Sequence, residues 1–171
     1  MTSPIFEMLL NPSTMLDGEK ALIGMDDGAV PLLRDFLDGS AKNANGVAYR
    51  SLGLPLRCVL EVITRLGPHA RGLENHLVKE LQAGNAIAAK ALGLLGQASE
   101  TTIGALADSL ESAGAARSDF DLPYEAGFAL IRLGASEHPS VLRSIGASKR
   151  ACANWAKARE WAAKRDDTTS D

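Results

Sequence analysis

The sequence predicts an all-α protein, an irregular α-solenoid of about four helical hairpins followed by a C-terminal capping helix. Three apolar, helix-like runs end in a Leu-Gly pair, at Leu66-Gly67, Leu95-Gly96 and Leu133-Gly134, with a weaker relative at Ile23-Gly24. A second apolar run follows each of the three strong pairs, and a helix–Gly–helix unit that recurs at such spacing is typical of stacked hairpins. Ala, Leu and Gly dominate the apolar residues and aromatic residues make up only 5% of the chain, which favours closely packed helices over a β-sandwich.

Length and composition describe one domain of an ordinary soluble type. A chain of 171 residues that is 46% hydrophobic and 23% charged is long enough for one continuous core but not for two independent ones. We expect residues 1–165 to form a single helical-repeat domain and residues 166–171 to be a disordered polar tail. The formal net charge of −3 at pH 7 argues against a strongly basic face that binds nucleic acid, and it is compatible with a basic protein partner.

The cysteines and the N-terminal stretch favour a cytoplasmic location. Cys58 and Cys152 are far apart and form no CxxC pair, a pattern typical of reduced thiols in a reducing compartment. The N-terminal stretch has no positively charged leader before its apolar patch and no clean cleavage site. No apolar run approaches the ~20 residues that cross a bilayer, so we expect no membrane association.

In the N-terminal half, each predicted helix begins at a capping residue or a proline. Ser13 or Thr14 can cap the first main helix, and the acidic pair Asp26-Asp27 complements the dipole at the N-terminus of the next one. Pro55 either starts the third helix or kinks a longer one. The expected order is a short arm or one-turn helix over residues 1–13, helices over about 14–24 and 26–37, a loop over 39–47, and a helix that ends at Leu66.

The C-terminal half continues the same alternation. Gly67 supplies a left-handed position that ends a helix, and Pro68 can begin the next one. The run from Ala86 to Leu95 is almost wholly apolar, so we expect a helix buried on most sides, and Ser99 can cap its partner. The expected order is helices over about 68–82, 86–95 and 99–112, a second long loop over 113–122, and helices over about 123–133, 137–145 and 148–164.

Two of these helices resemble a known repeat family. Residues 88–96, Ala-Ala-Lys-Ala-Leu-Gly-Leu-Leu-Gly, and residues 125–134, Glu-Ala-Gly-Phe-Ala-Leu-Ile-Arg-Leu-Gly, are similar to the A-x-x-A-L-x-x-L-G first helix of HEAT-type repeats of the PBS-lyase kind. The likeness extends over about residues 14–146. It implies a scaffold whose concave face binds a partner, although a few relatives are lyases that attach bilin chromophores and a few are DNA glycosylases with a basic groove. The spacing of the joint glycines, 29 residues from Gly67 to Gly96 but 38 to Gly134, predicts an irregular stack.

Groups that could support catalysis or hold a metal are sparse. His69 and His76 lie seven residues apart, about 10.5 Å along a helix axis and too far to share one metal ion. His76 and Glu80 have helical spacing for zinc, but no HExxH motif or cysteine completes a site. Cys58 has the register of a small core residue, and Cys152 has no histidine nearby in sequence. We therefore expect solvated or capping histidines, no metal, no cofactor and no enzymatic activity.

The two long loops are the predicted place for partner binding. In a hairpin stack, the loops over residues 39–47 and 113–122 lie on one edge and flank the short link over 83–85, which would leave a notch. Aromatic anchors among polar residues are typical of interface hot spots, and acidic side chains suit a basic partner. The alternative is that Phe120 and Tyr124 pack into the core beneath the loop. The candidate partner-binding residues are Asp35, Asp38, Asn43, Asn45, Tyr49, Asp108, Glu111, Arg117, Asp119, Phe120, Asp121 and Tyr124.

The last predicted helix is locally basic and carries both tryptophans. Its lysines and arginines have two possible roles. They form a patch that binds nucleic acid or an acidic partner, or they form the solvated face of a terminal helix. Trp155 and Trp161 are six residues apart and diverge by about 120° around a helix. We expect one of them to seal the end of the stack and the other to be partly exposed.

The predicted function is a non-enzymatic protein-binding module that occludes its partner. A mildly acidic, cytoplasmic helical-repeat protein of this size resembles, by analogy of size and class, immunity proteins that neutralise bacterial toxins. A basic toxin domain is then the expected partner. The alternatives are a bilin-lyase-like or glycosylase-like enzyme or accessory protein, and a nucleic-acid binder that uses the basic C-terminal helix.

Overall fold

The structure, a computed structural model, describes residues 3–113 and 121–167, with side chains described as far as residue 164. Within these ranges the regular elements are helices, and strand-like pairing is limited to one antiparallel bridge between Lys42 and Ala48. The all-α class is therefore confirmed, whereas the solenoid arrangement stays a prediction. In the described part of the chain, no helix is both long enough and apolar enough to cross a membrane.

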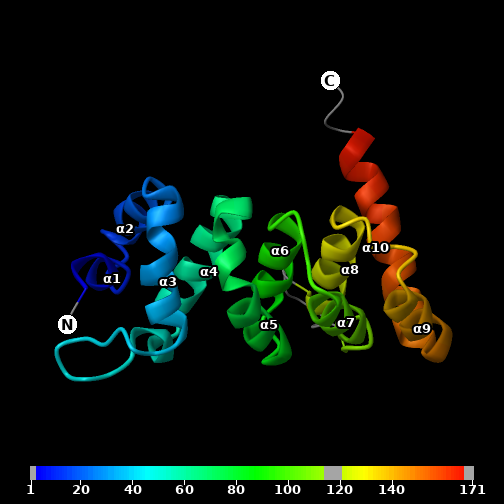
Figure 1. Cartoon of the computed structure of the whole chain (residues 1–171), viewed down its shortest axis with the longest axis horizontal. Helices are drawn as coiled ribbons and strands as arrows, with labels where there is room; N and C mark the ends of the chain where they lie inside the picture. The colour runs from blue at the N-terminus through cyan, green and yellow to red at the C-terminus, as the bar shows by residue number, and fades with distance from the viewer. Residues whose placement is uncertain (1–2, 114–120, 168–171) are drawn as a thin grey trace. The chain divides into compact units, whose positions relative to one another are not determined.

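The chain divides into two compact units, Met1–His76 and Leu77–Asp171, with the boundary inside α5 (Glu74–Gln82). Each unit is a set of packed helices (Figure 1). The prediction of one continuous domain stays a prediction.

In the first unit, α2 packs against α4, and α3 packs against the 3-10 helix η3. The short helix α1 packs against α2, where the small residue Gly18 leaves room for it, because a Cβ at Gly18 would lie 2.9 Å from Leu9 Cδ2. The elements of this unit are α1 (Pro4–Met8), α2 (Met15–Ile23), η1 (Asp26–Gly28), α3 (Ala29–Leu37), η2 (Tyr49–Leu52), α4 (Leu54–Leu66) and η3 (Gly67–Leu73).

An aromatic cluster occupies part of the core of the first unit. The ring centroids of Phe6 and Phe36 lie 5.1 Å apart, and those of Phe6 and Tyr49 lie 5.6 Å apart. Tyr49 is fully buried, and its hydroxyl donates a hydrogen bond to Glu7 Oε1 at 2.5 Å. Burial, then the hydrogen bond to Glu7 and the charge of that carboxylate, raise the pKa of Tyr49 to about 12.

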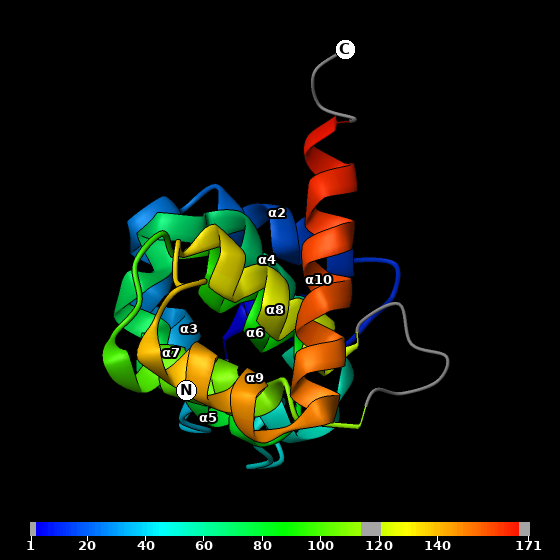
Figure 2. The ribbon, with the colours of Figure 1, turned by 90° about the vertical axis from the view of Figure 1, so that its right-hand side faces the viewer.

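The second unit is organised around α8, which packs against α6, α7 and α10, while α9 packs against α7 and α10. Figure 2 shows α10 running alongside α8. The elements of this unit that follow α5 are α6 (Ala86–Leu94), α7 (Glu100–Ser109), α8 (Leu122–Arg132), α9 (Pro139–Ala147) and α10 (Lys149–Asp167).

Two glycines let α8 approach its neighbours closely. A Cβ on Gly93 of α6 would lie 2.6 Å from Ala129 Cα, and a Cβ on Gly127 of α8 would lie 2.5 Å from Ala158 Cβ of α10. Real Cβ atoms are essentially never found at such distances, so a side chain at either glycine would force the facing alanine or its helix to move. The closely packed helices expected from the Ala-rich and Gly-rich composition are thereby confirmed in this unit.

The three strong Leu-Gly joints act as helix ends. The φ angles of Gly67, Gly96 and Gly134 are +52°, +77° and +67°, in the region that side chains other than glycine rarely adopt. Gly24, at the weaker Ile23-Gly24 pair, has φ −67° and is an ordinary helical residue. The helix ends predicted at the strong pairs are therefore confirmed, each with a glycine of positive φ, and the weaker pair lacks this geometry.

Element boundaries agree with the predicted ones to within a few residues; one open alternative is decided, and two elements differ from the prediction. Pro55 lies in the first turn of α4 and so starts this helix rather than kinking a longer one. The helix expected from Pro68 begins as 3-10 turns and becomes α-helical only at Glu74. Helix α10 continues to Asp167, into the segment predicted to be a disordered tail.

The predicted capping residues behave differently from one another. Ser99 accepts a hydrogen bond from the Thr102 amide at 3.3 Å and caps α7 as expected. Thr14 stands at the N-cap position of α2 but makes no capping hydrogen bond. Its hydroxyl instead donates to the Met8 carbonyl at 2.8 Å, which joins the end of α1 to the start of α2.

The close crossing of α6 and α8 gives a first prediction. Gly93→Ala should lower the free energy of unfolding by about 1–3 kcal/mol, because its methyl group would overlap Ala129. Gly104→Ala in α7 is the matched control, since nothing lies within 4 Å of its added Cβ. This control should be neutral or should stabilise by about 0.4–1 kcal/mol through the unfolded state. Urea unfolding of both variants measures the difference, and equal effects would contradict the tight crossing.

A second prediction concerns pH and Tyr49. Its pKa is about 12 in the folded chain against 10.0 for an exposed tyrosine, so the unfolded chain loses this proton first as the pH rises. The stability that depends on the neutral phenol is complete below pH 10 and is lost between pH 10 and about 12. Urea midpoints measured across this window should fall less steeply in Tyr49→Phe than in the wild type. Identical slopes would show that Tyr49 does not carry the effect.

Candidate functional site

A cluster of aromatic side chains reaches the surface of the second unit, where α8 and α10 pack together. We call Tyr124, Phe128, Lys157 and Trp161 the aromatic surface. Tyr124 and Phe128 are four residues apart on α8, as are Lys157 and Trp161 on α10, so each pair lies on one helix face. The ring centroid of Trp161 lies 5.2 Å from that of Tyr124 and 6.4 Å from that of Phe128.

A cation lies over this cluster. The Lys157 ammonium is 4.8 Å from the Tyr124 ring centroid and 5.0 Å from that of Trp161, within the range of cation–π attraction. Phe128 is buried beneath the cluster, whereas the Trp161 side chain remains 39% exposed. The arrangement is therefore a partly exposed tryptophan that packs against two aromatic rings and lies beside a lysine ammonium.

The two tryptophans differ in exposure, as their spacing predicts. Trp155 is buried, and its ring lies 3.9 Å from the position of a Cβ built on Gly127. Trp161 is directed to the aromatic surface and is partly exposed. The expectation of one buried and one partly exposed tryptophan is confirmed.

The predicted site residues of the first unit differ in their exposure and in their hydrogen-bond partners. Asp35, Asp38 and Asn45 are exposed, but Asp38 already contacts His76. The Asn43 side-chain oxygen accepts hydrogen bonds from the amides of Asn45 and Val47, both at 3.0 Å, and so holds its own loop together. Tyr49 was expected to line a notch, and this is wrong, because it is fully buried and bonded to Glu7.

The predicted residues of the second unit are only partly described. Asp108 and Glu111 are exposed at the C-terminal end of α7, and Asp121 is half-buried at the start of α8. Tyr124 is half-buried against Trp161 and belongs to the aromatic surface. The remaining candidates lie outside the described residues: Arg117, Asp119 and Phe120. The notch drawn between the two long loops stays a prediction.

Sequence reasoning missed most of the aromatic surface. Of its members, only Tyr124 was a candidate. The available signal was the four-residue spacing of Tyr124 to Phe128 and of Lys157 to Trp161, which puts each pair on one helix face. Nothing in the sequence indicates that the two faces meet.

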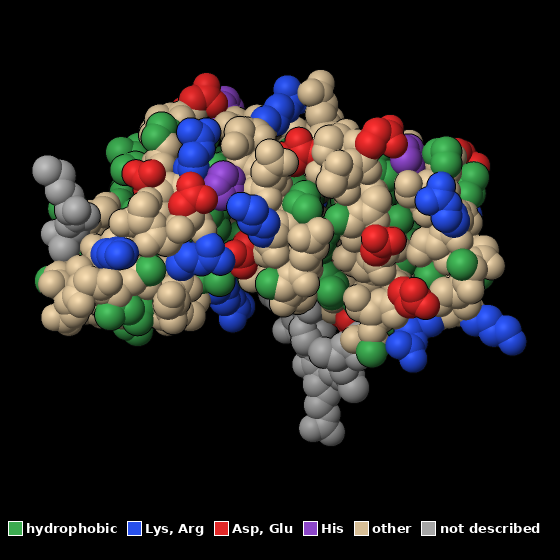
Figure 3. All heavy atoms as spheres, turned by 60° about the horizontal axis from the view of Figure 1, so that its bottom comes forward, with side chains coloured by type: hydrophobic (Ala, Val, Ile, Leu, Met, Phe, Trp, Pro, Cys, Tyr) green, Lys and Arg blue, Asp and Glu red, His purple; other side chains and the backbone are tan. Residues whose placement is uncertain are grey.

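Each of the three histidines lies beside a carboxylate from another element of its own unit. The nitrogen–oxygen distances are 2.9 Å for His69 and Asp27, 3.0 Å for His76 and Asp38, and 2.8 Å for His138 and Glu100. In Figure 3, histidines (purple) lie at the surface beside acidic side chains (red). In the described part of the chain, no three metal-ligating side chains gather.

His138 has a second contact, which assigns it a capping role. Its Nδ1 accepts a hydrogen bond from the Ser140 amide at 3.2 Å at the start of α9, while Nε2 faces Glu100 of α7. The imidazole therefore both caps α9 and connects it to α7.

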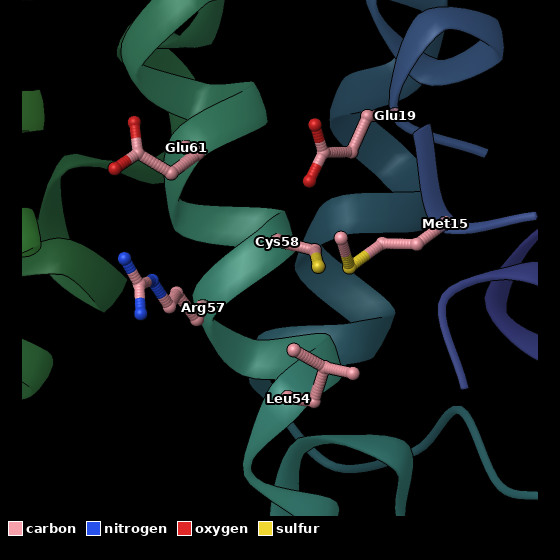
Figure 4. A pocket seen from close by; sticks show the side chains of 6 residues that line it. All are labelled: Met15, Glu19, Leu54, Arg57, Cys58 and Glu61. Carbon is pink, nitrogen blue, oxygen red and sulfur yellow. The ribbon is translucent and has the colours of Figure 1, made fainter. Parts of the chain in front are cut away.

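The first unit has a pocket of about 290 Å³ between α2 and α4. Figure 4 shows the carboxylate of Glu19 extending from α2 toward α4, and the sulfur atoms of Met15 and Cys58 facing one another. The residues that line this pocket, called the α2–α4 pocket below, are Met15, Glu19, Leu54, Arg57, Cys58 and Glu61.

Cys58 is unsuited to act as a nucleophile in this pocket. The residue is buried, as its register predicted. Burial raises the pKa of its thiol to about 11, and the Glu19 carboxylate, which accepts a hydrogen bond from the thiol, adds to this shift. At neutral pH the thiol is therefore protonated and behaves as a small apolar side chain with a weak donor.

Comparison of the chain with protein-family models, curated proteins and solved structures finds no match. The resemblance to HEAT-type repeats accordingly stays an expectation, and the site is interpreted from its geometry alone.

The two cysteines give a third prediction. Cys152 is exposed and should react quickly with a thiol reagent at neutral pH, while Cys58 should react slowly. The rise of the Cys58 pKa from 9.0 to about 11 lowers its thiolate fraction about a hundredfold, and burial restricts access further. Mass spectrometry should find one fast label in the folded wild type and almost none in Cys152→Ser. Both thiols should react in denaturant, and fast labelling of folded Cys152→Ser would contradict the burial of Cys58.

Proposed function

We propose that this protein is a non-enzymatic protein-binding module that contacts its partner through the aromatic surface of α8 and α10. The observation that carries the proposal is the partly exposed Trp161, packed against Tyr124 and Phe128 with Lys157 above the Tyr124 and Trp161 rings. Tryptophan and tyrosine are the side chains most enriched at the energetic centres of interfaces.

The aromatic surface is also preorganised, which supports binding. Phe128 is buried below Trp161, and the helices that carry both residues meet at the tight contact of Gly127 and Ala158. A side chain already held in place loses little rotamer freedom when a partner covers it, so more of the contact energy remains for affinity.

Exposed carboxylates support a basic partner. Asp108 and Glu111 in the second unit, and Asp35 in the first, are exposed acidic side chains. Exposed charges outside the centre of an interface mainly accelerate association and select partners of opposite charge. The narrower proposal, an immunity protein that occludes a basic toxin domain, rests on analogy of size and class.

The other two functions have less support from the geometry. An enzyme that uses Cys58 would need a thiolate, and burial keeps this thiol protonated at neutral pH. A nucleic-acid surface on α10 would use its basic side chains to bind phosphates, but two of these side chains already have partners within the chain. Lys157 lies over the aromatic rings and Lys164 pairs with Glu160 at 2.6 Å, an interaction that also lowers the pKa of Glu160.

Capture of the partner from a lysate of the source cells tests the proposal. Wild-type bait should retain a single protein, and Trp161→Ala should retain at least about tenfold less, the loss expected for an interface hot spot. Leu142→Ala is the matched control, because Leu142 is a 45% exposed apolar residue of the same unit, on α9. It should retain the partner as the wild type does.

Two other results would count against this assignment. Equal capture by wild type and Trp161→Ala would remove the aromatic surface from the interface. Retention that disappears with nuclease treatment and falls steeply with salt would favour the nucleic-acid alternative. For the immunity function, the captured protein should be toxic to cells when expressed alone and harmless when expressed with this chain.

A further inference from the structure

We propose that the α2–α4 pocket binds the guanidinium group of an arginine side chain presented by a partner protein. This inference rests on the proposed function, since it names a second contact that a basic partner would make. It concerns a different surface and different residues from the aromatic surface, so the two can be tested separately.

The pocket has the size and walls that a long cationic side chain needs. Its volume is about 290 Å³, and Met15 of α2 and Leu54 of α4 supply apolar surface. Leu54 is 40% exposed, so apolar contact remains available at this wall of the pocket. The aliphatic part of an arginine can lie along such surface while its charged end reaches a polar group.

Glu19 is the carboxylate that α2 contributes to the pocket, whereas Arg57 and Glu61 both lie on α4. The pocket lining as a whole carries two carboxylates and one guanidinium, a formal charge of −1. Within the described residues, Glu19 forms no ion pair, and its hydrogen-bond donor is the Cys58 thiol.

A thiol is a weak donor, and it leaves most of the acceptor capacity of the Glu19 carboxylate unused. In Figure 4 this carboxylate extends into the space between the two helices, above the facing sulfur atoms of Met15 and Cys58. A guanidinium group donates two parallel hydrogen bonds to a carboxylate and also carries a positive charge. A lysine ammonium lacks the planar pair of donors, and an uncharged urea group lacks the charge. Charge and shape together therefore favour arginine.

The test uses the full chain with methyl-labelled methionine and N-acetyl-L-arginine amide as the probe. We expect the Met15 methyl resonance to shift in a saturable way on titration, while those of Met8 and Met25 remain in place. N-acetyl-L-citrulline amide, which has the same shape without the charge, should bind at least about tenfold more weakly. Absence of a saturable shift at Met15, or an equal response to citrulline, would overturn the proposal.

Variants identify the group that binds the probe. Glu19→Gln should weaken binding at least about tenfold, because it removes one charged partner of a bidentate pair. Glu137→Gln, the same chemical change at an exposed residue of the second unit, is the matched control and should bind as the wild type does. Glu19→Asp retains the carboxylate and should bind with intermediate affinity, provided that its circular dichroism matches the wild type. Unchanged binding by folded Glu19→Gln would overturn the assignment.

Failure of this inference can be distinguished from failure of the proposed function. Trp161→Ala should bind the arginine probe as the wild type does, because the α2–α4 pocket is formed only by residues of the first unit. If a partner is captured through Trp161 but the probe does not bind, the pocket assignment is wrong and the function stands. If the probe binds in a Glu19-dependent way but Trp161→Ala captures normally, the pocket stands and the aromatic surface is wrong.

Discussion

The second unit contains a helix crossing that leaves no room for even a methyl group at one glycine. Gly127 of α8 meets Ala158 of α10 so closely that a Cβ on the glycine would lie 2.5 Å from the alanine Cβ. Tyr124 lies three residues before this glycine and Trp161 three residues after this alanine, so in an antiparallel crossing one turn on each side brings the two rings together. The aromatic surface is thus a direct consequence of the crossing, and the binding role proposed for it depends on the same contact.

Polar side chains of the first unit differ in how strongly they are hydrogen-bonded within the unit. The buried Tyr49 donates its hydroxyl proton in a hydrogen bond to Glu7, and the Asn43 side-chain oxygen accepts two hydrogen bonds from its own loop. Glu19 is different, because its hydrogen-bond donor is a thiol at the edge of a pocket. The contrast follows from hydrogen-bond strength: a buried phenol needs a strong acceptor, whereas a thiol contributes little to satisfying a carboxylate.

Features set by neighbouring residues were predicted well from the sequence. The Leu-Gly joints identify helix ends because only glycine enters the left-handed region without strain, and the φ angles of Gly67, Gly96 and Gly134 agree. Ser99 caps α7 because the amide it needs is only three residues away. Thr14 has the same local preference, but its hydroxyl is directed to the end of α1, where it donates a hydrogen bond to the Met8 carbonyl.

The sequence by itself therefore determined the helical class, the approximate helix boundaries, the burial of Cys58 and the different exposures of the two tryptophans. All of these depend on periodicity and on contacts within a few residues of the chain. Only the tertiary structure decided that Tyr49 bonds to Glu7, that His138 contacts Glu100, and that Trp161 packs against Tyr124. These partners are separated by 42, 38 and 37 residues of sequence, and no local propensity encodes which distant helix faces will meet.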